Sequence, residues 1–241
     1  SITTLSENAF YYFGKQELKN KVILIEDLDG AENALYPLRE LQTKKRIEEA
    51  IKREENVKAC VIVHFGGQSA ELFGQNGIVS YCESLNIKTI IDAAHAFPAF
   101  DDYGPVGSVG DVTCFSFYAN KTMTTGEGGM VVTNSSEISE RIKVMRLHGI
   151  NRDIWDRFTK AGASWEYDVI APGYKYNMPD VNAAIGLAQL ERVDEFRNER
   201  QRCAEKYFEL LGDIDKLNLP KSRVSKESHS WHLFAVSLTE N

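Results

Sequence analysis

The sequence has 241 residues, of which 43% are hydrophobic and 26% are charged, and its formal net charge is −7. This composition is ordinary for a globular protein. The acidic balance argues against a general nucleic-acid surface, which requires a basic face. No apolar run approaches the roughly 20 residues that a membrane-spanning helix needs.

The four cysteines are scattered along the chain and form no CxxC pair. This spacing indicates neither a zinc site nor a disulfide framework. We therefore expect free, mostly buried thiols in the reducing environment of the cytoplasm.

Three short apolar runs in the first hundred residues alternate with helical patterns. The runs Lys21–Asp27, Ala59–Gly67 and Lys88–Asp92 are rich in β-branched residues and end at acids or glycines, as buried strands do. Between them, residues 44–55 and 75–85 place apolar side chains at helical spacing. This alternation predicts parallel βαβ units, and hence an α/β fold whose sheet is covered on both faces.

Two further strands are predicted after Asp92, at residues 112–117 and 130–134, and the turn between them holds a lysine. Residues 137–147 have the spacing of a helix. Residues 151–176 are irregular and rich in aromatic side chains, for which packing is favoured over the stacking of a sugar.

A long, highly charged helix is predicted to begin near Pro179–Asp180 and to continue to Leu211, and Trp231–Leu238 is predicted to be a strand. We expect residues 1–178 to form a large domain. Residues 179–241 would then supply a linking helix and the beginning of a smaller α+β domain, which is cut short because its last strand has no partner after it.

Polar side chains stand at or near the ends of three predicted strands, namely His64, Asp92 and Ser116. Parallel α/β sheets bind their ligands at such carboxyl ends. A carboxylate at Asp92 can pair with a cationic ring nitrogen, bind a metal, act as a base or cap the helix-like segment AAHAF that follows. His64 precedes an FGG turn, where packing or support of the turn is favoured over catalysis.

Lys121 lies in a turn whose neighbours are hydroxyl side chains and glycines, directly after the apolar stretch FSFYA. A lysine in a turn is usually a solvated charge, and the spacing alone is a weak signal. The apolar approach favours partial desolvation, which lowers the pKa of a lysine and makes its amine available as a nucleophile. The chain has no GxxxxGK[ST] motif, so this is not the phosphate-binding loop of an NTPase.

Five segments resemble, in order and spacing, the DegT/DnrJ/EryC1/StrS family of pyridoxal-phosphate-dependent sugar aminotransferases. They are IIDAAHAF, GSVGDVTCFSFYANKTMTTGEGGMVVTN, RLHGI, APGYKYNMPDVNAAIGLAQLERVD and WHLFAV. The resemblance covers about residues 20–238. It implies fold type I of the aspartate aminotransferases, with a mostly parallel mixed sheet flanked by helices and a truncated smaller domain.

The resemblance also implies roles for four residues around a pyridoxal phosphate cofactor. Lys121 corresponds to the Schiff-base lysine, and Asp92 to the acid that keeps the pyridine nitrogen protonated. Ser116 corresponds to the hydroxyl that holds the phosphate. His95 stands where the family most often has Gln against the ring's phenolic oxygen, and its tautomer and charge stay open. No metal is implied.

Lys175, in the segment GYKYNM, stands where the family has an Asn that reaches the phosphate of the neighbouring subunit's cofactor. A lysine can bind that phosphate as a point charge, which implies a homodimer with a shared active site. Asn177 replaces an Arg of the family, and no role follows for it. His148, in RLHG, corresponds to a segment near the sugar site, but a structural role is equally open.

The activity implied by the resemblance is a ping-pong transamination. Its amino group is expected from glutamate, and its acceptor is a nucleotide-linked keto-sugar used for a surface polysaccharide or an antibiotic. A cyclitol ketone is another acceptor within the family. The family also includes a pyridoxal-phosphate sugar dehydratase, in which a histidine replaces the lysine, so Lys121 argues against that activity.

Members of the family are longer at both ends. The part that supplies a first phosphate-binding turn and an aromatic residue against the cofactor ring has no counterpart before residue 20. We therefore expect an internal fragment of such an enzyme. The alternative is a non-catalytic homologue or fragment that serves as a binding or dimerisation module.

Overall fold

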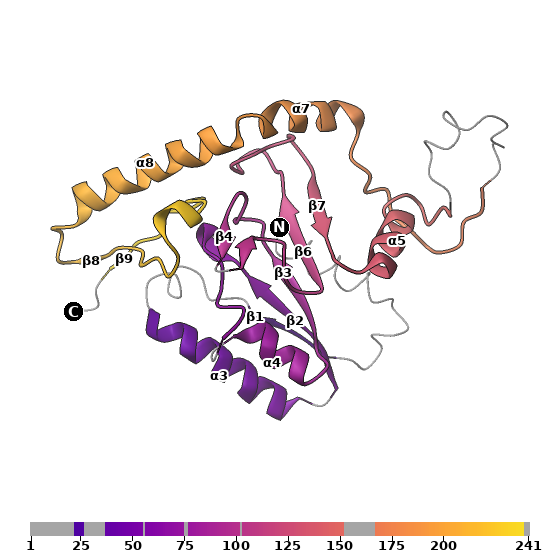
Figure 1. The fold of residues 1–241 in the computed structure, drawn as a ribbon, viewed down its shortest axis with the longest axis horizontal. Coiled ribbons are helices and arrows are strands. Elements are labelled where there is room, and N and C mark those ends of the chain that lie inside the picture. Colours follow the sequence, from indigo (N-terminus) through magenta and orange to yellow (C-terminus); the bar gives the residue numbers. More distant parts are fainter. Residues whose placement is uncertain are drawn as a thin grey trace.

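The structure is a computed structural model that describes residues 22–26, 37–54, 56–74, 77–101, 103–151 and 167–238. Its centre is a five-stranded sheet in the order β1-β2-β3-β6-β7 (Figure 1). The strands of this sheet are β1 (Val22–Glu26), β2 (Val57–Val63), β3 (Lys88–Asp92), β6 (Val112–Ser116) and β7 (Gly129–Val132).

The first four strands of the sheet run parallel, and β7 runs antiparallel to β6. Each coincides with a strand predicted from an apolar run, so the mostly parallel mixed sheet of an α/β fold is confirmed. Two small ribbons accompany it, and of their four strands only β9 lies within a predicted strand. They are formed by β4 (Phe100–Asp101) with β5 (Gly104–Pro105), and by β8 (Leu217–Asn218) with β9 (Ser237–Leu238).

Two helices connect the first parallel strands and supply the main core. They are α3 (Pro37–Arg53) and α4 (Ile78–Ser84). Ile47 of α3 and Val79 of α4 are buried in one cluster with Ile62 and Ile91 of the sheet. The opposite face carries a smaller buried cluster, made of Ala59, Val61 and Ile90 with Cys114 packed against it.

Burial on both faces explains the sequence of β2, where every residue from Ala59 to Val63 is buried. A parallel strand buried on both sides has no need of polar alternation, so it appears as a continuous apolar run. The expected cover on both faces is therefore met at this strand.

In the described part of the chain, the sheet is followed by the helices α5 (Ser136–Met145), α7 (Asp180–Leu190) and α8 (Val193–Leu211). Figure 1 shows α7 and α8 crossing over the end of the sheet at which β6 ends. Among the described residues, no helix is long and apolar enough to cross a membrane.

The prediction of one long helix from Pro179–Asp180 to Leu211 is wrong, because a turn at Glu191 and Arg192 separates α7 from α8. Arg192 leaves the helical region, with φ −114° and ψ 7°. The two helices serve different surfaces. Gly186 of α7 packs so closely on the turn after β6 that a Cβ there would lie 2.8 Å from Thr125, whereas α8 packs on the C-terminal segment.

The predicted strand Trp231–Leu238 is also wrong over most of its length, since only Ser237–Leu238 forms a strand. Trp231 has a positive φ of 48°, and its ring and that of Phe234 pack edge-on against Phe208 of α8. The apolar side chains of this segment therefore form a layer of packed aromatic rings, and most of the segment is not a strand. The strand that does form pairs with β8, which precedes it in the sequence.

The C-terminal segment is fastened to the turn that follows β2. The N–H groups of Ser230 and Leu233 donate to the carbonyls of Gly67 and Gly66, both at 3.0 Å. Arg223 adds a hydrogen bond from Nη2 to Oγ of Ser69 at 2.9 Å. These bonds bring residues near position 230 to the carboxyl end of the sheet.

This contact predicts that Gly67→Ala destabilises the fold more than Gly74→Ala. Both glycines have positive φ, 112° and 87°, but a Cβ at Gly67 would lie 2.3 Å from Oγ of Ser230, whereas nothing lies within 4 Å of one at Gly74. Beyond the backbone strain that both share, the crowding should lower the free energy of unfolding by about 1–3 kcal/mol. Urea denaturation of the two variants checks this, and equal losses would show that the contact does not matter.

Candidate active site

The parallel strands β3 and β6 bring Asp92 and Ser116 to one face of the sheet at its carboxyl end. Asp92 pairs in register with Cys114, and Ser116 follows Cys114 by two residues, so the side chains of Cys114 and Ser116 point to the same face. Burial, and then the charge of Asp92, raise the pKa of the Cys114 thiol to about 12. The carboxylate therefore lies beside that thiol, on the face opposite α3 and α4.

The turn from β6 to β7 carries Lys121 and is closed by its own hydroxyl groups. The Oγ1 of Thr124 and the N–H of Thr125 donate to the Phe117 carbonyl at 3.2 and 2.9 Å. From α7, the Nδ2 of Asn182 donates to the Thr125 carbonyl at 2.6 Å. The threonine-rich sequence thus holds the lysine in a fixed loop between two strands.

Two opposing effects act on Lys121, which is partly buried. Burial lowers the pKa of its amine, and the negative charge of Asp92 counteracts part of that change. The net direction is downward, as the desolvation inferred from the sequence requires. The structure therefore brings the predicted lysine and the predicted acid into electrostatic contact.

Asp92 is 6% exposed, and its Oδ1 accepts the N–H of Ala94 at 2.9 Å. That bond is of the capping kind considered for this residue, but no helix follows, because Ala96 N–H donates to the Ala93 carbonyl and closes a turn. The capping bond and the proximity to Lys121 are therefore compatible.

His95 follows in the same turn, and its hydrogen bonding fixes its tautomer. The N–H of Gly66 donates to Nδ1 of His95 at 3.3 Å, which leaves the proton of a neutral ring on Nε2. Burial, and then the charge of Lys121, lower the pKa of His95 to about 4. The ring is therefore neutral at pH 7 and carries one N–H donor.

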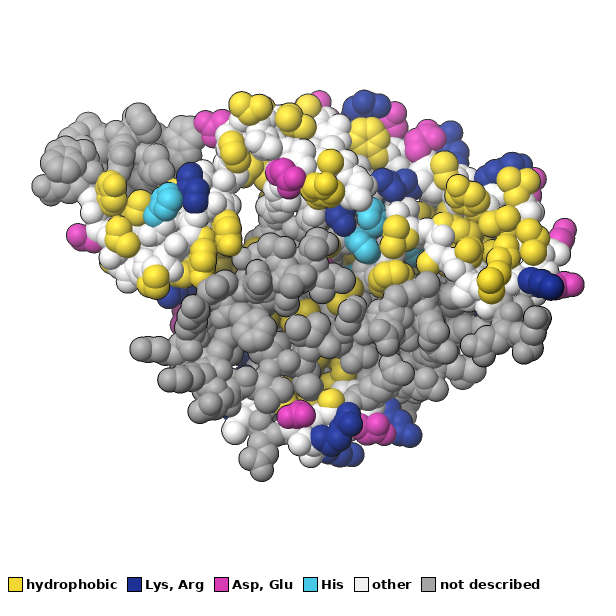
Figure 2. Space-filling model, turned by 180° about the vertical axis from the view of Figure 1, so that it is seen from behind, with side chains coloured by type: hydrophobic (Ala, Val, Ile, Leu, Met, Phe, Trp, Pro, Cys, Tyr) yellow, Lys and Arg dark blue, Asp and Glu magenta, His cyan; other side chains and the backbone are white. Residues whose placement is uncertain are grey.

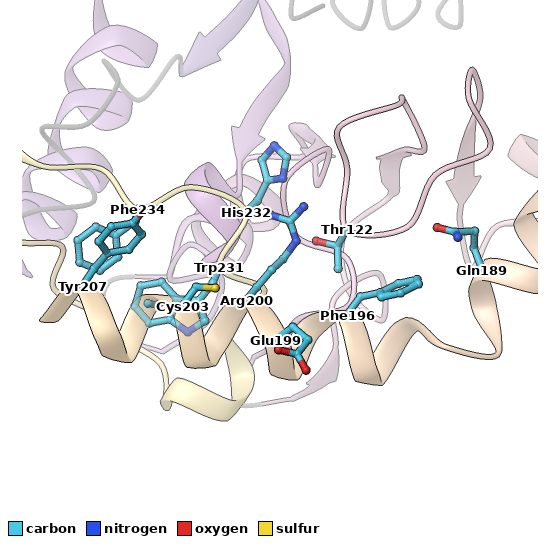
Figure 3. Close-up of a pocket in the computed structure, with 11 residues that line it drawn as sticks. Thr122, Gln189, Phe196, Glu199, Arg200, Cys203, Tyr207, Trp231, His232 and Phe234 are labelled. Atoms are coloured by element: carbon cyan, nitrogen blue, oxygen red, sulfur yellow. The ribbon is translucent and has the colours of Figure 1, made fainter. Parts of the chain in front are cut away.

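A second histidine, His232, lies against the first. Its ring centroid is 4.4 Å from that of His95, and Figure 3 shows its side chain beside that of Arg200. Burial, followed by the charges of His95, Lys121 and Arg200, lowers the pKa of His232 to about 3. Sequence analysis missed both His232 and Arg200. The one available signal was a histidine inside the apolar run WHLFAV, which was interpreted as a strand.

His64 has the supporting position that was favoured for it. It is 1% exposed, and its Nδ1 accepts the N–H of Ala70 at 3.2 Å across the glycine turn. Burial, and then the charge of Arg223, lower the pKa of His64 to about 3. A neutral imidazole therefore braces the turn that receives the C-terminal segment.

Lys175 and His148 lie on two paired segments of the chain, apart from the residues described above. Lys175 forms an isolated bridge with Leu147, and the N–H of His148 donates to the Tyr174 carbonyl at 2.8 Å. The ammonium of Lys175 donates to Oδ1 of Asn177, the residue for which no role was predicted. Both predicted side chains are exposed, and within the described residues no hydrogen bond or ion pair joins them to Asp92, His95 or Lys121. Most of the aromatic stretch, residues 152–166, lies outside the described residues.

Comparison with known proteins identifies the family. The sequence model of the DegT/DnrJ/EryC1/StrS aminotransferase family matches residues 40–241. The uncharacterized protein MJ1066 of Methanocaldococcus jannaschii is 42% identical over 192 residues, which are 80% of this chain and 48% of that protein. The spore coat polysaccharide biosynthesis protein SpsC of Bacillus subtilis is 40% identical over 183 residues, or 76% of this chain and 46% of SpsC.

Among solved structures, this chain is similar to PseC of Helicobacter pylori, an aminotransferase involved in the biosynthesis of pseudoaminic acid. The TM-score is 0.70 at 26% identity, over 82% of this chain and 49% of PseC. The chain thus spans about half the length of the curated relatives it matches.

The buried, neutral His64 predicts a loss of stability in acid. Its pKa is lower in the folded chain than the 6.5 of the free group, so below pH 6.5 the unfolded chain takes up a proton that the folded chain does not. Stability falls until the pH reaches the folded pKa, and between pH 8 and pH 5 the loss from this one group is about 2 kcal/mol.

His64→Asn keeps an acceptor for the Ala70 N–H but does not titrate, so it should remove that part of the pH dependence. His148→Asn is the matched control, since His148 is exposed and its φ of 57° suits Asn. Urea denaturation at the two pH values measures the effect. A His64→Asn variant that loses as much stability in acid as the wild type would contradict the assignment.

Proposed function

The chain belongs to the DegT/DnrJ/EryC1/StrS aminotransferase family, and on this premise we propose that it is a pyridoxal-phosphate-dependent aminotransferase that acts on a nucleotide-linked keto-sugar. The observation that carries the proposal is the partly desolvated Lys121, held opposite the buried Asp92 at the carboxyl end of the sheet. An ordinary surface lysine would have neither the burial nor the partner.

The described residues offer donors and acceptors that suit the cofactor. Asp92 would keep a proton on the ring nitrogen, and the Nε2–H of His95 would donate to the ring oxygen. The hydroxyl of Ser116, on the same face as Asp92, would hold the phosphate. When bound, pyridoxal phosphate supplies an electron-withdrawing ring that accepts the electron pair released at the substrate carbon.

Lys121 has two tasks in this mechanism. Its lowered pKa increases the fraction of neutral amine, which is the form that can attack a carbonyl carbon or accept a proton. Once its nitrogen is free, the same amine would be placed to take the proton from the substrate carbon and to return it to the carbon on the other side of the transferred nitrogen. The turn closed by Thr124 and Thr125 keeps that amine in place throughout.

The acceptor is assigned by class. SpsC takes part in spore coat polysaccharide biosynthesis and PseC in the biosynthesis of pseudoaminic acid, which supports an amino-sugar product. We propose glutamate as the donor, in a ping-pong reaction whose halves can be followed separately. A glutamate half-reaction and then a panel of nucleotide 4-keto-sugars would identify the acceptor.

We also propose the domain division and the compartment. Every strand of the main sheet precedes residue 178, and residues 179–238 contribute α7, α8 and the β8–β9 ribbon, which supports a large cofactor domain before a smaller one.

All four cysteines are free thiols, which favours a reducing compartment, and we assign the protein to the cytoplasm.

A homodimer with a shared active site is supported by the surface of α7. This helix is apolar, yet Val181, Ile185, Leu187 and Leu190 are exposed along it. Figure 2 shows hydrophobic side chains along the top of the molecule, where α7 lies. The neighbouring edge strand β7 also exposes Met130. Large exposed apolar side chains gathered on one helix mark it as an interaction surface. In such a dimer, Lys175 would reach the phosphate of the partner's cofactor.

Lys121→Ala should abolish covalent attachment of the cofactor and slow the glutamate half-reaction. Losing a general acid–base alone costs about 10²–10⁴-fold in rate. Borohydride reduction followed by peptide mass spectrometry should find the cofactor on the Lys121 peptide of the wild-type full-length protein and of Lys143→Ala, an exposed lysine of α5. A wild-type protein that binds no cofactor, or that carries it on another lysine, contradicts the proposal and favours a binding module.

Leu187→Glu should convert the dimer to monomers. The side chain is 69% exposed, so the charge is tolerated in a free subunit but costs free energy when it is buried in an interface. Leu210→Glu is the control, because Leu210 is 62% exposed on α8. Sedimentation velocity should give a monomer for the first variant and a dimer for the second. A dimer in both would place the interface elsewhere.

A further inference from the structure

A cavity of about 510 Å³ lies between α8 and the segment that contains Trp231 and Phe234. Figure 3 shows the rings of Trp231, Phe234 and Tyr207 toward one end of it. Arg200, His232 and Thr122, the residue next to Lys121, stand in the middle of the view, and Phe196 and Gln189 lie at the other end. The cavity therefore joins an aromatic compartment to a polar one, and the polar one adjoins the candidate active site.

The guanidinium of Arg200 is half-buried and largely unengaged. In the described residues its one hydrogen bond runs from Nη2 to the Asn120 carbonyl, at 3.4 Å. A guanidinium has five N–H donors in a planar fork, and it stays charged in proteins. Among the described residues, no Arg200 nitrogen is buried without a partner, so the other N–H donors are open to the cavity, where a ligand can accept them.

His232 also has a ring nitrogen without a hydrogen-bond partner. Its Nδ1 is buried, and it has no hydrogen-bond partner within the described part of the chain. The ring lies close enough to Arg200 and Lys121 for both charges to act on it. The buried Nδ1 itself does not face the cavity, but the residue lines it beside Arg200, and a neutral imidazole has one N–H that it can donate.

The charges around this point leave an excess of positive charge. Arg200 is a permanent cation, whereas the neighbouring His95 and His232 are neutral, and Lys121 is a cation only while its amine is free and protonated. Asp92 is the acid that acts on Lys121, and Figure 3 shows the carboxylate of Glu199 directed away from His232. An anion entering the cavity would meet two converging donors and an uncompensated positive field.

We propose that Arg200 and His232 form a binding site for an anionic group of the substrate and hold it next to Lys121. The group is either the carboxylate of the amino donor or the diphosphate of the nucleotide. Both present oxygens that a guanidinium binds through paired hydrogen bonds. This inference rests on the proposed aminotransferase function and adds to it the residues that orient the substrate.

The test uses the full-length protein loaded with cofactor and two probes that each carry only one kind of anionic group: 2-oxoglutarate, which has two carboxylates and no phosphate, and UDP, which has a diphosphate and no carboxylate. Isothermal titration calorimetry gives the dissociation constant of each. Arg200→Gln should weaken the probe that uses the site by about 10–100-fold, the usual effect of removing a hydrogen bond to a charged group. His232→Asn should weaken the same probe by a smaller factor. Which probe responds tells the carboxylate from the diphosphate.

Arg202→Gln is the matched control, because Arg202 is an exposed arginine of the same helix that pairs with Glu199 and lies outside the cavity. It should bind both probes as the wild type does. Urea denaturation and borohydride labelling of Lys121 should be unchanged in Arg200→Gln. If Arg200 only positioned the lysine turn through Asn120, labelling would change while neither dissociation constant did.

Two results would overturn the inference. The first is that Arg200→Gln binds both probes as tightly as the wild type does, and the second is that the wild type binds neither probe. These failures are distinct from failure of the proposed function, which would appear as an absence of cofactor on Lys121 in the wild type. If the cofactor is found on Lys121 but Arg200→Gln changes neither dissociation constant, the proposed function stands and the anion site at Arg200 is contradicted.

Discussion

The electrostatic contact between Asp92 and Lys121 is the constraint on which the rest of the site depends. Burial opposes the charged form of a carboxylate and of an amine alike, and each group offsets part of that cost for the other. Asp92 lies at the end of β3 and Lys121 in the turn after β6, and these strands are neighbours only in the sheet order of this fold. The sheet topology therefore sets the protonation of the lysine.

The turn that holds Lys121 is fixed from above by the two crossing helices. Asn182 of α7 donates to the Thr125 carbonyl, and Arg200 of α8 donates to the Asn120 carbonyl. The break at Glu191 lets one continuous segment reach both sides of the turn, since α7 and α8 contact different parts of it. The lysine turn is thus contacted by both helices, with the shorter hydrogen bond from Asn182 at 2.6 Å and a longer one from Arg200 at 3.4 Å.

The sequence predicted the parts of this arrangement that local patterns determine. Continuous β-branched runs mark doubly buried parallel strands, so the ends of β3 and β6, and with them Asp92 and Ser116, could be located. His232 could not be located, because its neighbourhood depends on contacts such as that of Ser230 with the His95 carbonyl, 135 residues apart. The break at Glu191 and Arg192 has no glycine or proline to announce it. The ring layer around Trp231 has the composition of a strand, and its difference from one lies in backbone angles that composition does not determine.

The protonation of His95 shows what the folded structure adds to such a pattern. A histidine in place of a glutamine can donate, accept or carry a charge, and the sequence left all three open. The Gly66 N–H occupies Nδ1, so the proton of the neutral ring is on Nε2. Burial and the nearby Lys121 disfavour a second proton. His95 is thereby restricted to a neutral donor of one hydrogen bond, the function that a glutamine amide would perform. Because Gly66 belongs to the turn that also binds Leu233, the docking of the C-terminal segment helps to fix that donor.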